Sequence, residues 1–496
     1  MRRAVVAGVT CLLVGGVGYA AADVVDVAPG ILTYDGAPVD PPTPTGTASA
    51  STDWAPLPSA AAPGGSTSPS ASSSRGAATP STAPTTAPTA APTTAGLTKV
   101  LAPLARDPWL GPTVGISVRD GVTGNELYAV QPTVPRAPAS TLKLLAAVAM
   151  TEHLEPDARM STKVVTGDGP GEVVLVAGGD TRLGDGASDT TSVAGHAGLA
   201  TLADEVAQSL RDRRLTAVTL KVDASYAAGP RYPAKWNPND VRDGFTQGVA
   251  MLGRATERPR IGRTSVAVAE VSVAKTLATL ITQRGVTTTV APFSGQGSRP
   301  PAAAQELGSV ESATYREVVE LALGDSDDAL TENLVRQAMA AAGTSAASLA
   351  APPAFVRESL IAAGIDVTGY VALDTSGLAY GQLVTATTLS DVLTLATTDR
   401  KPWLSEVVSN LPVAGLSGTL ADRFTGMQTK AAAGIPRAKT GTLTGISSLA
   451  GTTVTADGRL LTFVVLADRV PPSSGTLGAR AALDRFVTAL TLCGCR

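Results

Sequence analysis

The chain has 496 residues and a formal net charge of −3. That length suffices for roughly two to four domains, and the charge argues against nucleic acid as the main partner, which needs a clear basic excess. Only two histidines and three cysteines occur, which excludes most histidine-rich metal sites and argues against a Ser-His-Asp triad. We therefore expect no metal and no cofactor. Cys493 and Cys495 form a local disulfide or remain thiols.

The first 22 residues have the pattern of an export segment. Arg2 and Arg3 precede an uncharged, mostly apolar run over residues 4–22 that ends in small residues. This order is typical of a signal peptide, and a run of this length also suffices to span a bilayer once. Both alternatives, a cleaved signal and an uncleaved anchor, place the rest of the chain outside the cytoplasm, with membrane contact only through 1–22.

Residues 23–97 are expected to form a disordered spacer. From residue 41 onward they are almost wholly Pro, Thr, Ser, Ala and Gly. Because this stretch has few large apolar side chains to bury, it cannot offset the entropy lost on ordering. We therefore expect the globular body to start near residue 98.

The two ends of the body have the pattern of strands. Alternating or apolar stretches with turn residues between them predict strands, and they lie at 113–120, 125–130, 437–442, 445–455 and 459–468. A helix over 478–490 closes the chain. Hairpin-type links at both ends predict an α/β (α+β) fold, in which an antiparallel sheet with flanking helices joins strands from distant sequence.

Between these ends, an apolar helix starts at Ser140 and stops before Pro156. The segment 166–305 has its own alternation of strand-like and helix-like stretches and is long enough to be an inserted domain. We therefore expect one main domain built from two parts, 98–165 and 306–496, with the insertion between them.

A serine and a lysine three residues apart stand on the first turn of the apolar helix. Either Ser140 caps the helix while Lys143 extends to water, or the two are a nucleophile and its base. Residues i and i+3 share a helix face, and the positive helix end disfavours an ammonium and stabilises an oxyanion. A second Ser-x-x-Lys, at Ser272 and Lys275, lies inside a continuing helical run with no start signal. We interpret Ser272 as a packing residue.

The sequence Lys439-Thr440-Gly441-Thr442 lies on a predicted strand near the carboxyl end. A lysine and two hydroxyl groups along one edge suit a substrate carboxylate, and the glycine lets a peptide backbone approach closely. Lys-Thr-Gly alone is usually a surface turn. Here it occurs once, after both copies of Ser-x-x-Lys.

Three motifs therefore follow one another along the chain: Ser140-x-x-Lys143, Ser326-Asp327-Asp328 and Lys439-Thr440-Gly441. In this order they resemble the motifs of penicillin-binding proteins and serine β-lactamases. The long gap between the first two is similar to that of the D-alanyl-D-alanine carboxypeptidase/endopeptidase type of low-molecular-mass penicillin-binding protein, which carries inserted domains there. The resemblance covers nearly all of 98–496, and the end of the chain resembles actinobacterial members.

The resemblance implies the penicillin-binding-protein/β-lactamase fold and a serine-type D-Ala-D-Ala carboxypeptidase, with endopeptidase action through the same acyl-enzyme. Ser140 would be the nucleophile, Lys143 its base and Ser326 a proton relay. Backbone amides of Ser140 and Thr442 would hold the oxyanion. The implied partners are peptidoglycan stem peptides ending in D-Ala-D-Ala and β-lactam antibiotics, at the cell envelope and without a cofactor. Substrate binding would fall to Asp328, Lys439, Thr440, Gly441 and Thr442.

One position departs from the family pattern. The middle motif of the family ends in asparagine, and this chain has no Ser-x-Asn. An amide both donates and accepts hydrogen bonds, whereas an ionised aspartate only accepts. Asp328 is therefore expected to pair with Lys143, keep it charged and weaken it as a base. Two alternatives stay open: a cell-wall-binding protein without catalysis on the same fold, and a β-lactamase-like hydrolase, which the long insertion disfavours.

Overall fold

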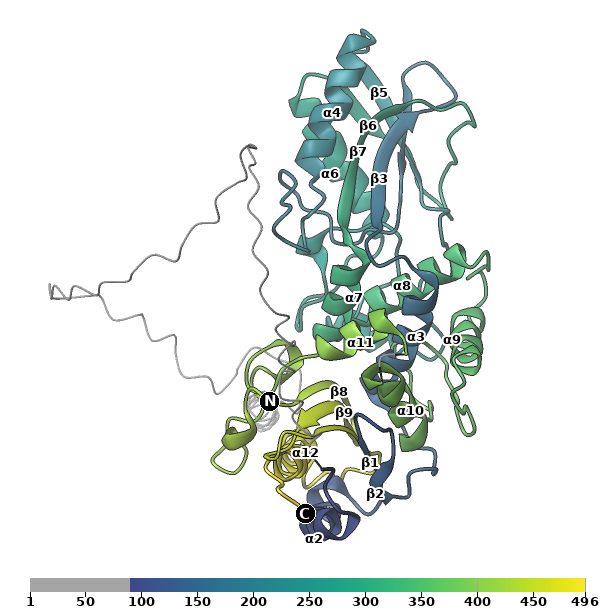
Figure 1. Ribbon diagram of the computed structural model, residues 1–496. Helices are drawn as coiled ribbons and strands as arrows, with labels where there is room; N and C mark the ends of the chain where they lie inside the picture. Colours follow the sequence, from purple (N-terminus) through teal and green to yellow (C-terminus); the bar gives the residue numbers. More distant parts are fainter. Residues whose placement is uncertain (1–89, 399, 496) are drawn as a thin grey trace, which may run out of the picture.

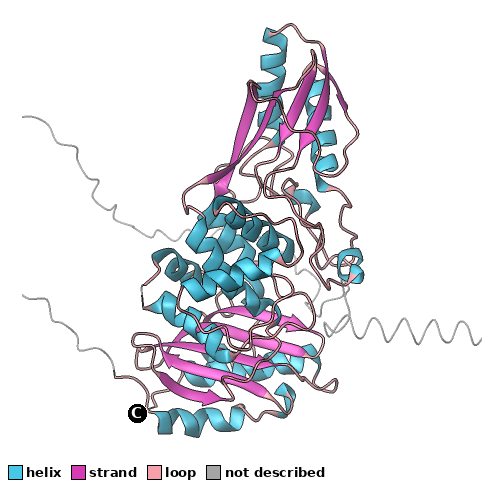
Figure 2. Ribbon diagram, turned by 90° about the vertical axis from the view of Figure 1, so that its right-hand side faces the viewer, coloured by secondary structure: helices cyan, strands magenta, loops and turns pink. Residues whose placement is uncertain are grey.

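The computed structural model describes residues 90–398 and 400–495. In this part of the chain, two five-stranded sheets lie at opposite ends of the body with a layer of helices between them (Figures 1 and 2). The expected export segment at 1–22 and most of the expected spacer lie outside the described residues. Within them, no helix combines the length and the apolar character that crossing a bilayer requires.

The first sheet is antiparallel and has the strand order β2-β1-β10-β9-β8. It confirms the prediction that strands from both ends of the body meet, since β1 pairs with β10 from Val114 opposite Ala467 to Asp120 opposite Leu461. Its strands are β1 (Val114–Asp120), β2 (Glu126–Val130), β8 (Arg437–Leu443), β9 (Ile446–Val454) and β10 (Leu460–Ala467).

Helices cover both faces of this sheet. Successive side chains of a strand point to opposite faces, so Phe463 and Val465 of β10 pack with one apolar cluster, while Val464 and Leu466 pack with another. The first cluster includes side chains of α2 (Thr94–Leu104) and α12 (Gly475–Thr491). The second belongs to the helical layer, whose members are α3 (Lys143–His153), α7 (Tyr315–Gly324), α8 (Asp328–Ala341), α9 (Ala351–Ala362), α10 (Ala386–Thr397) and α11 (Pro402–Ser409).

The second sheet has the order β6-β5-β4-β3-β7, with β3 antiparallel to both neighbours and β4, β5 and β6 parallel. Helices α4 and α6 pack on it and on each other. Because β3 pairs with β7, the sheet extends beyond the predicted segment 166–305 at both ends. Its elements are β3 (Arg159–Thr166), β4 (Glu172–Val176), α4 (Leu199–Asp212), β5 (Ala217–Asp223), α5 (Pro238–Arg242), α6 (Ala269–Gln283), β6 (Thr287–Val290) and β7 (Glu306–Thr314).

Helix α2 begins inside the stretch expected to be disordered, so the expected start of the body near residue 98 is wrong. Thr93 caps the helix, its hydroxyl accepting the N–H of Gly96 at 3.1 Å, and the Thr93 N–H donates to the carbonyl of Cys495 at 2.8 Å. Leu97 is fully buried. Thr93 and Leu97 lie at the end of a Pro/Thr/Ala-rich tract. The composition of this tract predicts disorder and does not indicate that a helix begins there. Cys495 itself is disulfide-bonded to Cys493.

We expect a chain starting at Thr98 to be less stable than one starting at Ala90. The shorter chain loses the buried Leu97 side chain and the Thr93 cap, together worth about 3 kcal/mol of unfolding free energy. Denaturant unfolding of the two chains measures the difference, and Leu97→Ala in the longer chain should reproduce most of it. Equal unfolding midpoints would contradict a docked first turn.

Helix α8 carries a carboxyl group into the protein interior. The side chain of Glu332 is 1% exposed, and its Oε1 accepts the N–H of Thr375 at 2.7 Å. Burial, aided by the negative charge of Asp374, raises the pKa of Glu332 from 4.5 to about 7. The folded protein therefore keeps this proton up to about pH 7, whereas the unfolded chain loses it near pH 4.5. The unfolding free energy must fall as pH rises through this window.

Replacing this group should remove that pH dependence. Glu332→Gln retains an oxygen acceptor for Thr375 but does not ionise. We expect the unfolding free energy of the variant, relative to wild type, to increase between pH 4.5 and pH 7 by roughly 3 kcal/mol and to stay level above it. Denaturant unfolding at several pH values tests this, with the exposed Glu155→Gln as control. A difference that does not change with pH would refute it.

Candidate active site

Three segments that are distant in sequence come into contact: the start of α3 with the turn before it, the start of α8 with the link before it, and strand β8 of the first sheet. These segments contain the three sequence motifs. Lys143 Nζ contacts both Ser140 Oγ and Asp328 Oδ1, and Lys439 Nζ contacts Ser326 Oγ. The structure therefore brings all three motifs to one place.

Ser140 lies in a 3₁₀ turn, Ala139–Leu142, and the regular helix α3 begins only at Lys143. The prediction that the helix starts at Ser140 is thus wrong by one turn, although the i, i+3 contact is present. The N-cap residues of the 3₁₀ turn and of α3 are Pro138 and Leu142, not Ser140, and Lys143 is fully buried. This excludes the alternative in which serine caps the helix and lysine extends to water.

The ammonium group of Lys143 has three acceptors. Its Nζ lies 3.0 Å from Ser140 Oγ, 2.5 Å from Asp328 Oδ1 and 2.7 Å from the carbonyl oxygen of Ser376. A lysine ammonium has three N–H donors, so each is used. Burial raises the pKa of the Asp328 carboxyl, while the charge of Lys143 acts to lower it. The expected contact between Asp328 and Lys143 is confirmed.

Ser326 and Asp327 lie in the tight link between α7 and α8, and Asp328 is the first residue of α8. Ser326 has a positive φ of 57°, which is uncommon for a serine and recurs at functional sites. Asp327 caps α8 by accepting the N–H of Leu330 at 2.9 Å. Asp327 also pairs with Arg182 and Arg258, which lie on loops between elements of the second sheet. Burial alone would raise the pKa of Asp327, but the two arginines keep it below its usual value.

Strand β8 supplies a second buried lysine. Lys439 is fully buried, and its Nζ donates to Ser326 Oγ at 2.9 Å and to the carbonyl of Thr440 at 2.8 Å. Burial, together with the charge of Lys143, holds the pKa of Lys439 well below its usual value, although Asp328 opposes this effect. Its acceptors are neutral oxygens, so a carboxylate that arrived here would favour its ammonium form.

Strand β8 also packs with its backbone directly against the 3₁₀ turn Ala139–Leu142, which we call the serine turn. A Cβ added to Gly441 would lie 2.6 Å from the carbonyl oxygen of Pro138 and 3.1 Å from the backbone nitrogen of Ser140. Only glycine fits. The backbone that comes close here is that of the turn carrying Ser140, whereas the sequence analysis assigned the close approach to a substrate peptide. Thr440 donates its hydroxyl hydrogen to Thr419 Oγ1 at 2.9 Å. Thr442 is partly exposed and is placed by strand pairing, opposite Ser447 of β9.

The second Ser-x-x-Lys lies elsewhere and has a structural role. Ser272 is on α6, beside the second sheet, and its Oγ donates to Glu257 Oε1 at 2.5 Å. Lys275 is exposed. Lys275 is therefore in solvent and is not hydrogen-bonded to Ser272 in the described part of the chain, which agrees with the interpretation of Ser272 as a packing residue.

Two contributors to the site escaped the sequence analysis. The Ser376 carbonyl that contacts Lys143 is a backbone group, which no residue type marks. Thr419, the partner of Thr440, lies in a short 3₁₀ turn, Gly418–Leu420, and the sequence analysis assigned it no role.

Comparisons with known proteins agree with this geometry. A family model described as the D-Ala-D-Ala carboxypeptidase 3 (S13) family matches residues 97–253 and 252–490. The chain is 34% identical over 409 residues to carboxypeptidase Rv3627c of Mycobacterium tuberculosis and 32% identical over 405 residues to carboxypeptidase DacB of Mycolicibacterium smegmatis. Each alignment covers 80% of this chain and 84% of the relative.

Among solved structures, penicillin-binding protein 4 (dacB) from Haemophilus influenzae superposes with a TM-score of 0.61 over 79% of this chain and 98% of that chain. At 17% identity, this likeness concerns the fold, and it confirms the fold expected from the three motifs. The match of the family model extends over most of the body, and the two mycobacterial relatives exceed 30% identity over most of their length. The chain therefore belongs to the D-Ala-D-Ala carboxypeptidase 3 (S13) family.

Proposed function

We propose that this chain is a serine-type D-Ala-D-Ala carboxypeptidase that cleaves peptidoglycan stem peptides through an acyl-enzyme on Ser140. The observation that carries the proposal is the contact of 3.0 Å between Ser140 Oγ and the fully buried Lys143 Nζ. A serine is a weak nucleophile unless an adjacent base takes its proton. Comparison with relatives gives no support to a non-catalytic wall-binding protein or to a β-lactamase-like hydrolase over this function.

In the proposed reaction, Ser140 Oγ attacks the carbonyl carbon between the two D-alanines while its proton moves to Lys143 Nζ. The terminal D-alanine leaves as an amine, to which Ser326 relays a proton. Water then attacks the ester and releases the shortened peptide. Endopeptidase action differs only in the amine that leaves, so the same acyl-enzyme serves for both reactions.

Two further groups of atoms complete the site. Backbone N–H groups of Ser140 and Thr442 stabilise the oxyanion, which the close approach of Gly441 to the Ser140 nitrogen supports. Lys439, Thr440 and Thr442 bind the terminal carboxylate of the peptide, or the carboxylate of a β-lactam that acylates the same serine. Asp328 contributes by contacting Lys143.

The proposed substrate sets where the protein acts. Peptidoglycan lies outside the cytoplasmic membrane, so we infer that the chain acts in the cell envelope. The segment 1–22 would direct export and would either be removed or remain as an anchor. In both cases membrane contact is confined to that segment.

Penicillin labelling tests the nucleophile. We expect a fluorescent penicillin to acylate the wild-type protein at Ser140, since this serine has a lysine within hydrogen-bond distance. Ser140→Ala should abolish the label, and the matched variant Ser272→Ala should keep it. Mass spectrometry of the labelled peptide identifies the serine. Label on the peptide that contains Ser272 would refute the assignment.

A second measurement tests the departure in the middle motif. The carboxylate of Asp328 favours the ammonium form of Lys143, which is not a base. Asp328→Asn should remove this effect and speed penicillin acylation at neutral pH by about tenfold at most. The gain should shrink as pH rises. If the variant is slower at every pH, the aspartate serves the reaction and the picture of a weakened base is wrong.

A further inference from the structure

A buried loop, residues 374–379, packs beside the site. It has no regular secondary structure, so its backbone N–H groups need partners from elsewhere. Asp374 accepts three of them: Oδ1 from Ser376 at 3.1 Å and from Gly377 at 2.7 Å, and Oδ2 from Ala379 at 2.7 Å. One carboxylate therefore determines the course of most of this loop.

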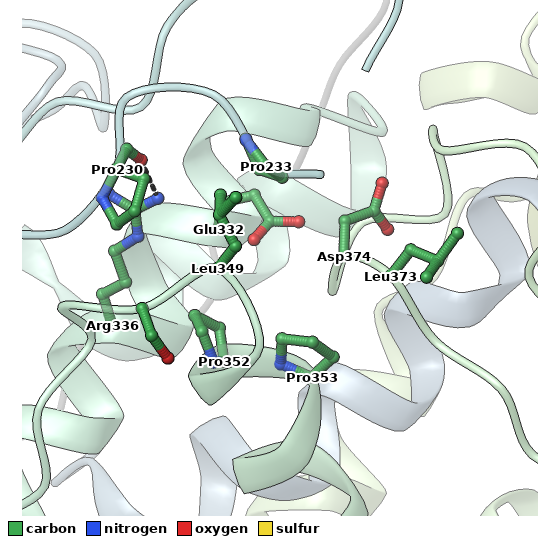
Figure 3. Close-up of a pocket in the computed structure, with 10 residues that line it drawn as sticks. Pro230, Pro233, Glu332, Arg336, Leu349, Pro352, Pro353, Leu373 and Asp374 are labelled. Atoms are coloured by element: carbon green, nitrogen blue, oxygen red, sulfur yellow. Dashed lines mark hydrogen bonds between the residues drawn. The ribbon is translucent and has the colours of Figure 1, made fainter. Parts of the chain in front are cut away.

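Other side chains fix that carboxylate in turn. Trp236 Nε1 donates to Asp374 Oδ2 and Gln382 Nε2 donates to Asp374 Oδ1, each at 2.8 Å. Glu332 accepts one more N–H of the loop, that of Thr375. Figure 3 shows Glu332 and Asp374 at the edge of a cavity of about 10 Å³, which has room for about one water molecule.

The loop contacts both members of the nucleophile–base pair. The carbonyl of Ser376 accepts from Lys143 Nζ at 2.7 Å. Gly377 has a φ of +91°, and a Cβ added to it would lie 2.0 Å from the carbonyl oxygen of Ala139 and 3.0 Å from the nitrogen of Ser140. The backbone of the loop therefore lies directly against the serine turn.

These contacts bear on the direction of the lysine lone pair. A lysine that acts as a base is a neutral amine with two N–H groups and one lone pair. If its two hydrogens point to Asp328 Oδ1 and to the Ser376 carbonyl, the lone pair is left facing Ser140 Oγ. Without the carbonyl, the amine rotates about its Cε–Nζ bond, and many of its orientations cannot accept the serine proton.

We propose that Asp374 is a positioning residue for this reaction. By ordering the loop 374–379, it keeps the Ser376 carbonyl on Lys143 and so directs the amine lone pair to Ser140. The inference rests on the proposed function, in which the proton of Ser140 moves to Lys143 as the bond from Oγ to the carbonyl carbon forms. Asp374 neither gains nor loses a proton in this step.

The test is the kinetics of penicillin acylation by the full-length chain, resolved into a non-covalent dissociation constant and an acylation rate constant. Asp374→Asn replaces one acceptor oxygen by an NH₂ group that faces N–H donors, which should loosen the loop. We expect its acylation rate constant to fall about ten- to a hundredfold and its dissociation constant to change less than about twofold, because the substrate-binding strand β8 is intact.

The matched control is Asp120→Asn. Asp120 is also a buried aspartate that accepts two backbone N–H groups, those of Val122 and Thr123, but in the turn between β1 and β2. It also pairs with Arg459 at 2.7 Å, so Asp120→Asn should lower the thermal unfolding temperature at least as much as Asp374→Asn. It should leave the acylation rate constant unchanged. A loss of stability alone is thereby separated from a loss of positioning.

The outcomes distinguish this inference from the proposed function. Wild-type protein that is not labelled at Ser140 would contradict the function itself. Labelling at Ser140 with an unchanged rate constant in folded Asp374→Asn, or with a loss confined to the dissociation constant, would overturn the role of Asp374 alone. If that variant does not fold, Trp236→Phe, which removes one donor to Asp374, should still lower the rate constant several-fold. An unchanged rate constant there would likewise overturn the role.

Discussion

The structure around the site depends on the burial of one ammonium group. A lysine that has no access to water needs an acceptor for every N–H, since an unpaired buried donor costs about 1–3 kcal/mol. Lys143 stands on α3, whose residues from Lys143 to Met150 are all buried, so its side chain has no path to solvent. Its three acceptors belong to three segments. Satisfying this one group therefore joins the serine turn, the start of α8 and the loop 374–379.

Close backbone packing then sets the shape of the site around Ser140. Gly441 of β8 and Gly377 of the loop 374–379 both approach the serine turn where a Cβ would collide with it. The turn is thus held between a strand and a loop. Backbone N–H groups placed by two packed segments need little reorganisation when charge develops on a carbonyl oxygen, which is the arrangement that acyl transfer requires.

Charge links the second sheet to the same place. Asp327 caps α8 and pairs with Arg182 and Arg258 from the segment between β4 and β7. Its neighbours in the motif face the two buried lysines. The middle motif therefore joins the two structural units while presenting Ser326 and Asp328 to the site, and a change at Asp327 would affect both the anchoring of the second unit and the start of α8.

The sequence by itself determined the strands at both ends of the body and the positions of the motifs. Strand alternation and hairpin turns are local patterns, and the spacing of Ser140 and Lys143 alone brings their side chains together through one turn of chain. The same local information identified Gly441 as a residue that permits close approach, but it assigned that approach to a substrate peptide and not to the turn that carries Ser140. It did not reveal that Ser140 lies in a 3₁₀ turn, because the backbone there is shaped by the packing of β8 and the loop 374–379.

Only the tertiary structure decided where the body begins, which backbone groups contribute to the site, and which Ser-x-x-Lys is part of it. Leu97 belongs to the body because it packs in an apolar cluster with α12, and no composition within the Pro/Thr/Ala tract indicates that contact. The role of the Ser376 carbonyl has no sequence signature, since every residue carries the same backbone oxygen. The burial of Lys143 and the exposure of Lys275 separate two identical spacings. Such differences arise from contacts between residues far apart in the chain, which local patterns do not encode.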